Sequence, residues 1–164
     1  MKKFILLFIL MPSISLAASM SMIGEKGKLS EVNRVIEVKM YDNFYEPNEI
    51  KVKKGETIKF KVYNFGELVH EFNIATKKMH LKHQPEMVKL IENEILLADK
   101  IEKKKMKEMA KKDQSMSHSH ANSVLLEPNE DGEIIWKFNT EVKLEAACNI
   151  PGHYETGMIA KIKY

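Results

Sequence analysis

Three side chains that can ligate a metal lie at equal spacing near the C-terminal end of the chain. Cys148 is followed by His153 and then by Met158, with four residues between each pair. Cys148 is the only cysteine in the sequence, so the chain cannot form an internal disulfide. A thiolate, an imidazole and a thioether together suit copper, because blue-copper sites combine two His and one Cys with a distant axial Met. A second histidine ligand should therefore lie elsewhere in the chain.

His70 meets this requirement. It lies within Asn64–Ile74, where a loop passes into an alternating apolar stretch that has the pattern of a strand. Taken singly, a free cysteine is most often an inert small hydrophobe, and a methionine is most often part of a core. The chemistry and order of the four side chains favour a metal site instead. We therefore predict that His70, Cys148, His153 and Met158 are copper ligands.

At these residues the chain resembles the cupredoxins, the family of blue, or type 1, copper proteins. The spacing C-x4-H-x4-M is the longer ligand loop that rusticyanin and auracyanin also have. The motif V-H-E-F-N-I around His70 and the motif G-H-Y-E-T-G-M-I-A-K-I from Gly152 are similar to those of periplasmic cupredoxins associated with copper resistance. The resemblance covers residues 35–77 and 124–164.

This resemblance implies an all-β fold, a cupredoxin-like Greek-key β-sandwich, in which a rigid frame holds the four ligands. It implies that the bound copper cycles between Cu(I) and Cu(II) and so transfers single electrons. It also implies that His153 lies near the surface, ringed by Ile150, Pro151 and Gly152, where electrons would leave the protein.

The first residues have the pattern of an export signal. Lys2 and Lys3 precede an apolar run from Phe4 to Met11, and the small residues Ser15 and Ala17 follow at the expected cleavage positions. This pattern predicts a secretory signal peptide over residues 1–17, and its apolar run is too short to span a bilayer. We expect one domain over residues 18–164, located in the periplasm without a membrane anchor. Metal ligation also explains how a single thiol persists in an oxidising compartment.

Short alternating segments predict the strands of the sandwich. Apolar and polar residues alternate over 58–62, and a Lys54-Gly55 turn lies between this segment and Ile50–Lys53, so we expect the two to form a hairpin. Many short strands with Gly and Pro turns favour a β-sandwich. Further strands are predicted at 35–40, 134–138, 142–147 and 158–162.

The middle of the chain does not fit a sandwich. From about Pro85 to Lys112, apolar residues recur at three- and four-residue steps, which is typical of an amphipathic helix. We expect this helix to lie against the sandwich as an insertion. The Ser- and His-rich segment Ser115–His120 would follow it as a mobile tail, and helix and tail together would occupy about residues 78–122.

Every histidine outside the predicted site falls in this insertion, together with five methionines. Short His-rich tracts often bind metal, and imidazoles and thioethers are suitable ligands for copper. A second, weaker copper site is therefore a hypothesis. The alternative is that the methionines fill the core and the histidines lie in a solvated linker. The candidate ligands are Met79, His80, His83, Met116, His118 and His120.

Two functions fit this pattern. One is a one-electron carrier, and the alternative is a copper-tolerance protein that binds excess periplasmic copper through the first site and the insertion. An oxidase or nitrite reductase would need additional His-rich copper centres, so we expect no enzymatic activity.

The distribution of charge bears on partners. Residues 77–120 hold eleven lysines against seven acidic residues, which leaves the rest of the exported chain mildly acidic. Such a surface favours a basic redox partner, such as a c-type cytochrome, and a copper-handling protein is the other expected partner. Nothing in the composition indicates nucleic-acid binding.

Overall fold

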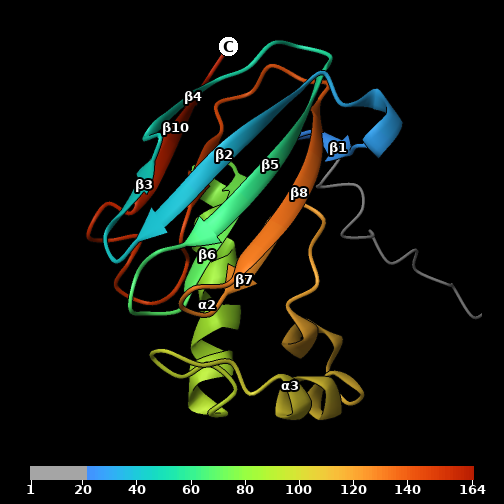
Figure 1. The fold of residues 1–164 in the computed structure, drawn as a ribbon. Helices are drawn as coiled ribbons and strands as arrows, with labels where there is room; N and C mark the ends of the chain where they lie inside the picture. The colour runs from blue at the N-terminus through green and yellow to red at the C-terminus, as the bar shows by residue number, and fades with distance from the viewer. Residues whose placement is uncertain (1–21) are drawn as a thin grey trace, which may run out of the picture.

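The computed structural model describes residues 22–164. The predicted signal peptide, residues 1–17, lies outside the described residues. Within the described part of the chain, two five-stranded sheets pack against each other (Figure 1). None of the helices in residues 22–164 has the length and apolar character needed to cross a membrane.

The first sheet has the order β1-β8-β5-β2-β3, and the second has the order β4-β10-β9-β6-β7. Two neighbouring pairs, β2 with β5 and β4 with β10, are parallel, and the other pairs are antiparallel. The strands are β1 (Glu25–Lys26), β2 (Arg34–Tyr41), β3 (Phe44–Glu46), β4 (Glu49–Lys51), β5 (Glu56–Asn64), β6 (His70–Ala75), β7 (Ser123–Leu126), β8 (Asp131–Phe138), β9 (Glu145–Ala147) and β10 (Ile159–Lys163). A short 3-10 helix, η1 (Leu29–Glu31), lies between β1 and β2.

The core lies between the two sheets. In β5 the apolar side chains at alternate positions, such as Phe60, are fully buried, while the lysines between them are less buried. This is the alternation expected of a strand with one face on a core. Phe60 reaches across to Phe72 of β6 in the other sheet, with ring centroids 5.6 Å apart. The sheet that carries His70 is therefore held by aromatic packing from the opposite sheet.

The predicted hairpin around Gly55 is wrong. A turn does form there, with Gly55 at φ +83°, but β4 and β5 lie in different sheets. β4 pairs with β10 in parallel, whereas β5 pairs with β2 and β8. Local turn chemistry does not specify which sheet each arm joins, because that choice depends on partners distant in sequence.

The insertion connects β6 to β7 and contains two helices, α2 (Lys77–Glu92) and α3 (Lys103–Ala110), followed by a 3-10 helix, η2 (Gln114–Ser117). The predicted helix therefore begins earlier than expected and is interrupted. Thr76 caps α2 by accepting a hydrogen bond from the backbone of Met79. After the helix, Glu94 takes a left-handed conformation at φ +50°, which ends the helical path.

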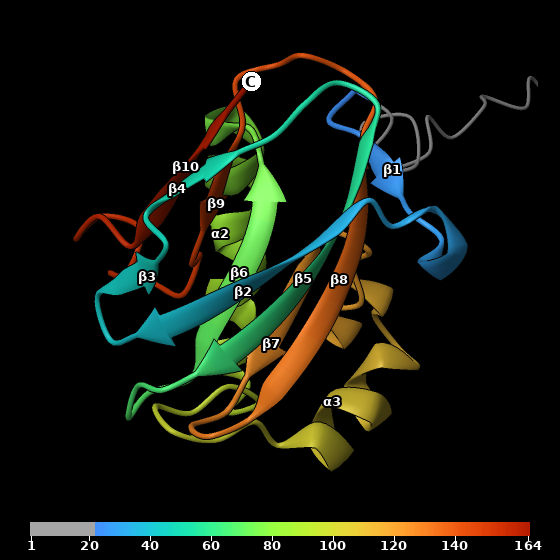
Figure 2. The same ribbon diagram turned by 45° about the horizontal axis from the view of Figure 1, so that its top comes forward.

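The insertion is packed against the sandwich. In Figure 2, α2 lies behind β6 and β9, on the face of the second sheet turned away from the first. Met87 and Leu90 of α2 are fully buried and join the hydrophobic core. The tail predicted to be mobile is also packed, since Met116 is 2% exposed and the His118 side chain is 3% exposed. An apolar methionine between the polar residues supplies the anchor that holds this segment.

Candidate metal centre

The loop between β9 and β10 carries three of the four predicted ligands. Cys148 directly follows β9, and Met158 directly precedes β10. The Cys148 N–H donates to the carbonyl of Met158 at 3.2 Å, and the Met158 N–H donates to the carbonyl of His153 at 3.0 Å. The main chain therefore closes the loop on itself, which brings the backbones of these three residues together. Met158 is fully buried within this closure.

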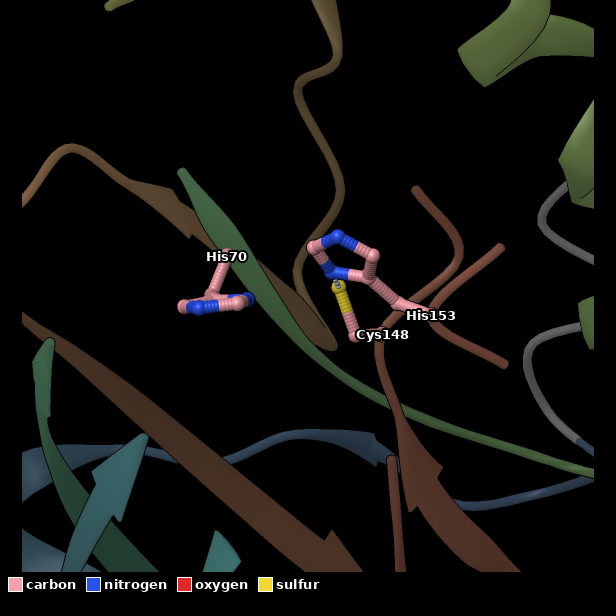
Figure 3. A group of neighbouring side chains, drawn as sticks. All are labelled: His70, Cys148 and His153. Carbon is pink, nitrogen blue, oxygen red and sulfur yellow. Dashed lines mark hydrogen bonds between the residues drawn. The ribbon is translucent and has the colours of Figure 1, made fainter. Parts of the chain in front are cut away.

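His70 reaches the same place from the start of β6 (Figure 3). The ligand atoms of His70, Cys148 and His153 all lie within 4.8 Å of one another. Cys148 Sγ is 3.4 Å from His153 Nδ1, and the two imidazole rings have centroids 5.0 Å apart. Three donors that are distant in sequence thus converge on one small volume.

The orientation of His70 leaves one nitrogen free. Its Nε2 lies 3.1 Å from Asp42 Oδ1, and the carboxylate accepts a hydrogen bond there. The same oxygen accepts from the backbone N–H groups of Glu67 and Leu68, so the β2–β3 turn and the loop before β6 are joined at Asp42. His70 Nδ1 is buried and has no hydrogen-bond partner. Buried polar atoms are rarely left unpaired, so this nitrogen fits a metal ligand.

The protonation of the three side chains follows from burial. Burial lowers the pKa of His70 and outweighs the opposing effect of Asp42, and burial together with His70 lowers the pKa of His153. Both imidazoles are therefore neutral at pH 7 and hold a lone pair for a cation. Burial raises the pKa of the Cys148 thiol to about 12, so a metal that binds the sulfur must displace its proton.

Glu71, the residue after His70, supports the centre in two ways. Its backbone N–H donates to Cys148 Sγ at 3.4 Å. Its buried carboxylate accepts from the backbone N–H of Asn149 at 3.2 Å and from Asn149 Nδ2 at 2.7 Å. Asn149 Oδ1 in turn lies 3.1 Å from Nδ1 of His80 in α2. The insertion thus fixes the residue beside the cysteine ligand.

Asp42, Glu71 and Asn149 are supporting residues that the sequence analysis missed. Glu71 could have been recognised, because it is an acidic residue that directly follows a predicted ligand inside an apolar strand. Asp42 lies 28 residues before His70, and nothing local links the two.

His153 borders an apolar hollow that extends beyond the ligand loop. This hollow beside its ring is lined by Ile150 and by residues of two other segments. Leu68 and Val69 come from the loop before β6, and the insertion supplies Ile91, Leu96, Leu97 and Ala98. Ile91 and Leu97 are 40% and 41% exposed, so this apolar surface reaches solvent.

Of the six candidates for a second site, the structure brings three together: His83, His118 and His120. His80 is separate, because both of its ring nitrogens face the β9 end of the ligand loop, at Asn149 and the carbonyl of Glu145. Met116 belongs to the hydrophobic core and Met79 packs against it, which is a sufficient role for each.

Comparison with known proteins decides the family. The family model described as a cupredoxin-like domain matches residues 5–100, more than half of the chain. The chain is a cupredoxin. The match ends before Cys148, so the assignment does not depend on the ligand loop. The family and the β-sandwich predicted from the sequence are both confirmed.

Curated relatives extend the match across this cupredoxin. The copper-resistant cuproprotein CopI of Pseudomonas aeruginosa is 38% identical over 145 residues, which are 85% of this chain and 80% of the relative. The protein of the same name from Rubrivivax gelatinosus is 29% identical over 85% of this chain and 71% of its own length. Among solved structures, dithionite-reduced auracyanin from Roseiflexus castenholzii superposes with a TM-score of 0.57 at 18% identity, covering 80% of this chain and 97% of auracyanin.

Proposed function

We propose that this cupredoxin binds one copper ion through His70, Cys148 and His153, with Met158 as the axial ligand, and exchanges single electrons there. The observation that carries the proposal is the buried, unpaired Nδ1 of His70, held within reach of a buried thiol and a second neutral imidazole. Two His, one Cys and one Met are the donor set of blue-copper electron-transfer sites.

When bound, copper would supply a one-electron couple between Cu(I) and Cu(II). The protein residues keep that couple in place. Asp42 fixes the ring of His70, and the Glu71 N–H donates to the sulfur of Cys148. Such outer hydrogen bonds orient ligands and tune the metal. Four protein ligands leave no position for a substrate, which supports a carrier over an enzyme.

Electrons would enter and leave through His153. Its ring borders the apolar hollow shared by the loop before β6 and the insertion, and a redox partner could dock on this surface. The partner we propose is a c-type cytochrome or a copper-handling protein. Short-lived redox complexes use small interfaces, and an apolar centre suits them.

We further propose that the protein works in the periplasm in copper tolerance. The N-terminal residues have the pattern of an export signal. Relatives that match 85% of this chain carry the name copper-resistant cuproprotein. Electron exchange and tolerance are compatible if the protein binds surplus copper and also changes its oxidation state.

Titration of the purified exported chain with Cu(II) tests the first centre. We expect an intense visible thiolate-to-copper charge-transfer band that saturates at one copper per chain. Cys148→Ser should abolish this band while the far-ultraviolet circular dichroism of the sandwich is retained. The matched control is Met87→Leu, which alters a buried sulfur residue outside the ligand loop and should leave the band unchanged. A band that persists in Cys148→Ser would exclude Cys148 as a ligand.

A further inference from the structure

Three imidazoles converge in the insertion, and we name His83, His118 and His120 the trihistidine cluster. His83 comes from the middle of α2, while His118 and His120 follow η2. Each pair of rings has centroids 5.2 Å apart, so the three rings form an equilateral triangle. One ligand nitrogen from each ring lies within 4.8 Å of the other two. This spacing would allow the three rings to share one metal ion.

Two carboxylates orient the rings. Glu71 Oε1 lies 3.2 Å from His83 Nε2 and 3.0 Å from His118 Nε2. Glu86 lies 3.3 Å from His83 Nδ1 and 3.1 Å from His120 Nε2. Metal-binding histidines commonly donate one ring N–H to a carboxylate, which fixes the ring and makes it a stronger donor. His118 and His120 each have one such contact, whereas both nitrogens of His83 face carboxylates, so a metal ion would displace one of its protons. A linker of solvated histidines would have no such supports.

The cluster is also enclosed and strained. The side chains of His83, His118 and His120 are only 12%, 3% and 20% exposed. His118 adopts a left-handed backbone at φ +45°, a conformation unfavourable for most residues other than glycine. Nε2 of His83 and Nε2 of His118 are 3.3 Å apart. Both nitrogens also face Glu71 Oε1, to which they donate in the metal-free protein, so a metal ion at this point would displace their protons.

We propose that the trihistidine cluster is a second copper site, with His83, His118 and His120 as ligands and Glu71 and Glu86 as their supports. Imidazole suits several transition metals, and among divalent ions Cu²⁺ binds such sites most tightly. Because no thiolate takes part, this copper would lack the intense visible band. The proposal extends the proposed function from one copper to two, but it does not depend on the ligands of the first centre.

Point variants test the site better than deletion of the insertion, because Met87 and Leu90 belong to the core. The test variant is the double replacement His118→Asn and His120→Gln. Asparagine tolerates the left-handed backbone at 118, and residue 120 is partly exposed. The matched control is Met79→Leu with Met116→Leu, which removes two thioethers of the insertion in nearly volume-conserving swaps.

Copper per chain is measured after Cu(II) loading and removal of loosely bound metal, together with the visible band and the electron paramagnetic resonance spectrum. We expect two coppers in the parent chain and in the methionine control, one coloured and one colourless. The histidine double variant should keep the band and lose one copper. Cys148→Ser should keep one colourless copper whose spectrum shows nitrogen coupling.

The outcomes separate the two centres. One coloured copper in the parent chain would overturn the second site and leave the first intact. A colourless copper that disappears in the histidine double variant, without any band in the parent, would overturn the first centre and support the second. A colourless copper that survives the histidine replacements, or Zn²⁺ binding tighter than Cu²⁺ in Cys148→Ser, would overturn the assignment of the trihistidine cluster to copper.

Discussion

Glu71→Gln should destabilise the metal-free protein by several kcal/mol without changing the shape of the side chain. The Glu71 side chain is fully buried. Burial alone would raise the pKa of Glu71, but hydrogen bonds from His118 and His83 hold it well below its usual range. A neutral amide cannot replace this carboxylate, because every group that faces the two oxygens is a donor.

The magnitude follows from the contacts. One oxygen accepts from Asn73, Ser123 and the two histidines, and the other accepts twice from Asn149. Wherever the new NH₂ group points, at least two donors lose their acceptor. Each buried donor left unpaired costs about 1–3 kcal/mol, and breaking a buried ion pair costs about 3–5 kcal/mol. We therefore expect a loss of about 3–5 kcal/mol.

Urea unfolding of the metal-free variants, followed by circular dichroism, measures this loss. The control is Glu133→Gln, which breaks a surface pair with Lys59 and should stay within about 0.5 kcal/mol of the parent. The N–H that donates to Cys148 Sγ belongs to the main chain, so the copper-loaded variant should keep its visible band. A Glu71→Gln protein within about 1 kcal/mol of the parent would refute the reasoning.

Three more predictions follow from the same geometry. Met158→Leu should keep the visible band but raise the reduction potential, since the axial ligand tunes it; an unchanged potential in voltammetry would argue against Met158 as that ligand. Asp42→Ala should lower copper affinity by about 10- to 100-fold by freeing the ring of His70, and equal affinity in competition with a chelator would contradict this role. Burial lowers the pKa of His83, but hydrogen bonds to Glu71 and Glu86 outweigh it and raise the pKa to about 10. Protonated His83 therefore stabilises the folded state. This stabilisation is fully present below the ordinary pKa of 6.5 and is lost as the pH rises to about 10. Metal-free stability should therefore fall over that range in the parent and fall less in His83→Gln, and parallel pH profiles of the two would count against the assignment.

The features that could be predicted from the sequence are those that depend on neighbouring residues in the chain. The donor types and order of Cys148, His153 and Met158 indicated the family, and alternation in β5 indicated a strand with one buried face. The sheet that each strand joins was not predictable in the same way. The turn after β4 has the sequence of a hairpin turn, yet β4 pairs with β10, more than a hundred residues later.

The insertion shows the same limit. Its histidines were recognised as a group, but their separation into His80 and the trihistidine cluster depends on which face of α2 meets Glu71 and which meets Asn149. The supporting acids were missed because their partners are tertiary: Glu71 meets His118 across 47 positions of the chain. Spacing in sequence reveals ligands that share a loop, and it does not reveal the residues that orient them.

In terms of chain connectivity, the insertion is a very long loop of a β-hairpin. β6 and β7 are antiparallel neighbours, with Asn73 opposite Ser123, so the two ends of the insertion lie side by side. A change of length at such a point costs little closure entropy and does not move His70. Removal of the insertion would, however, uncover the outer face of the second sheet and release Asn149 from His80. A cupredoxin that exchanged this segment for a short turn would therefore need new side chains to cover that face and a new partner for the residue beside its cysteine.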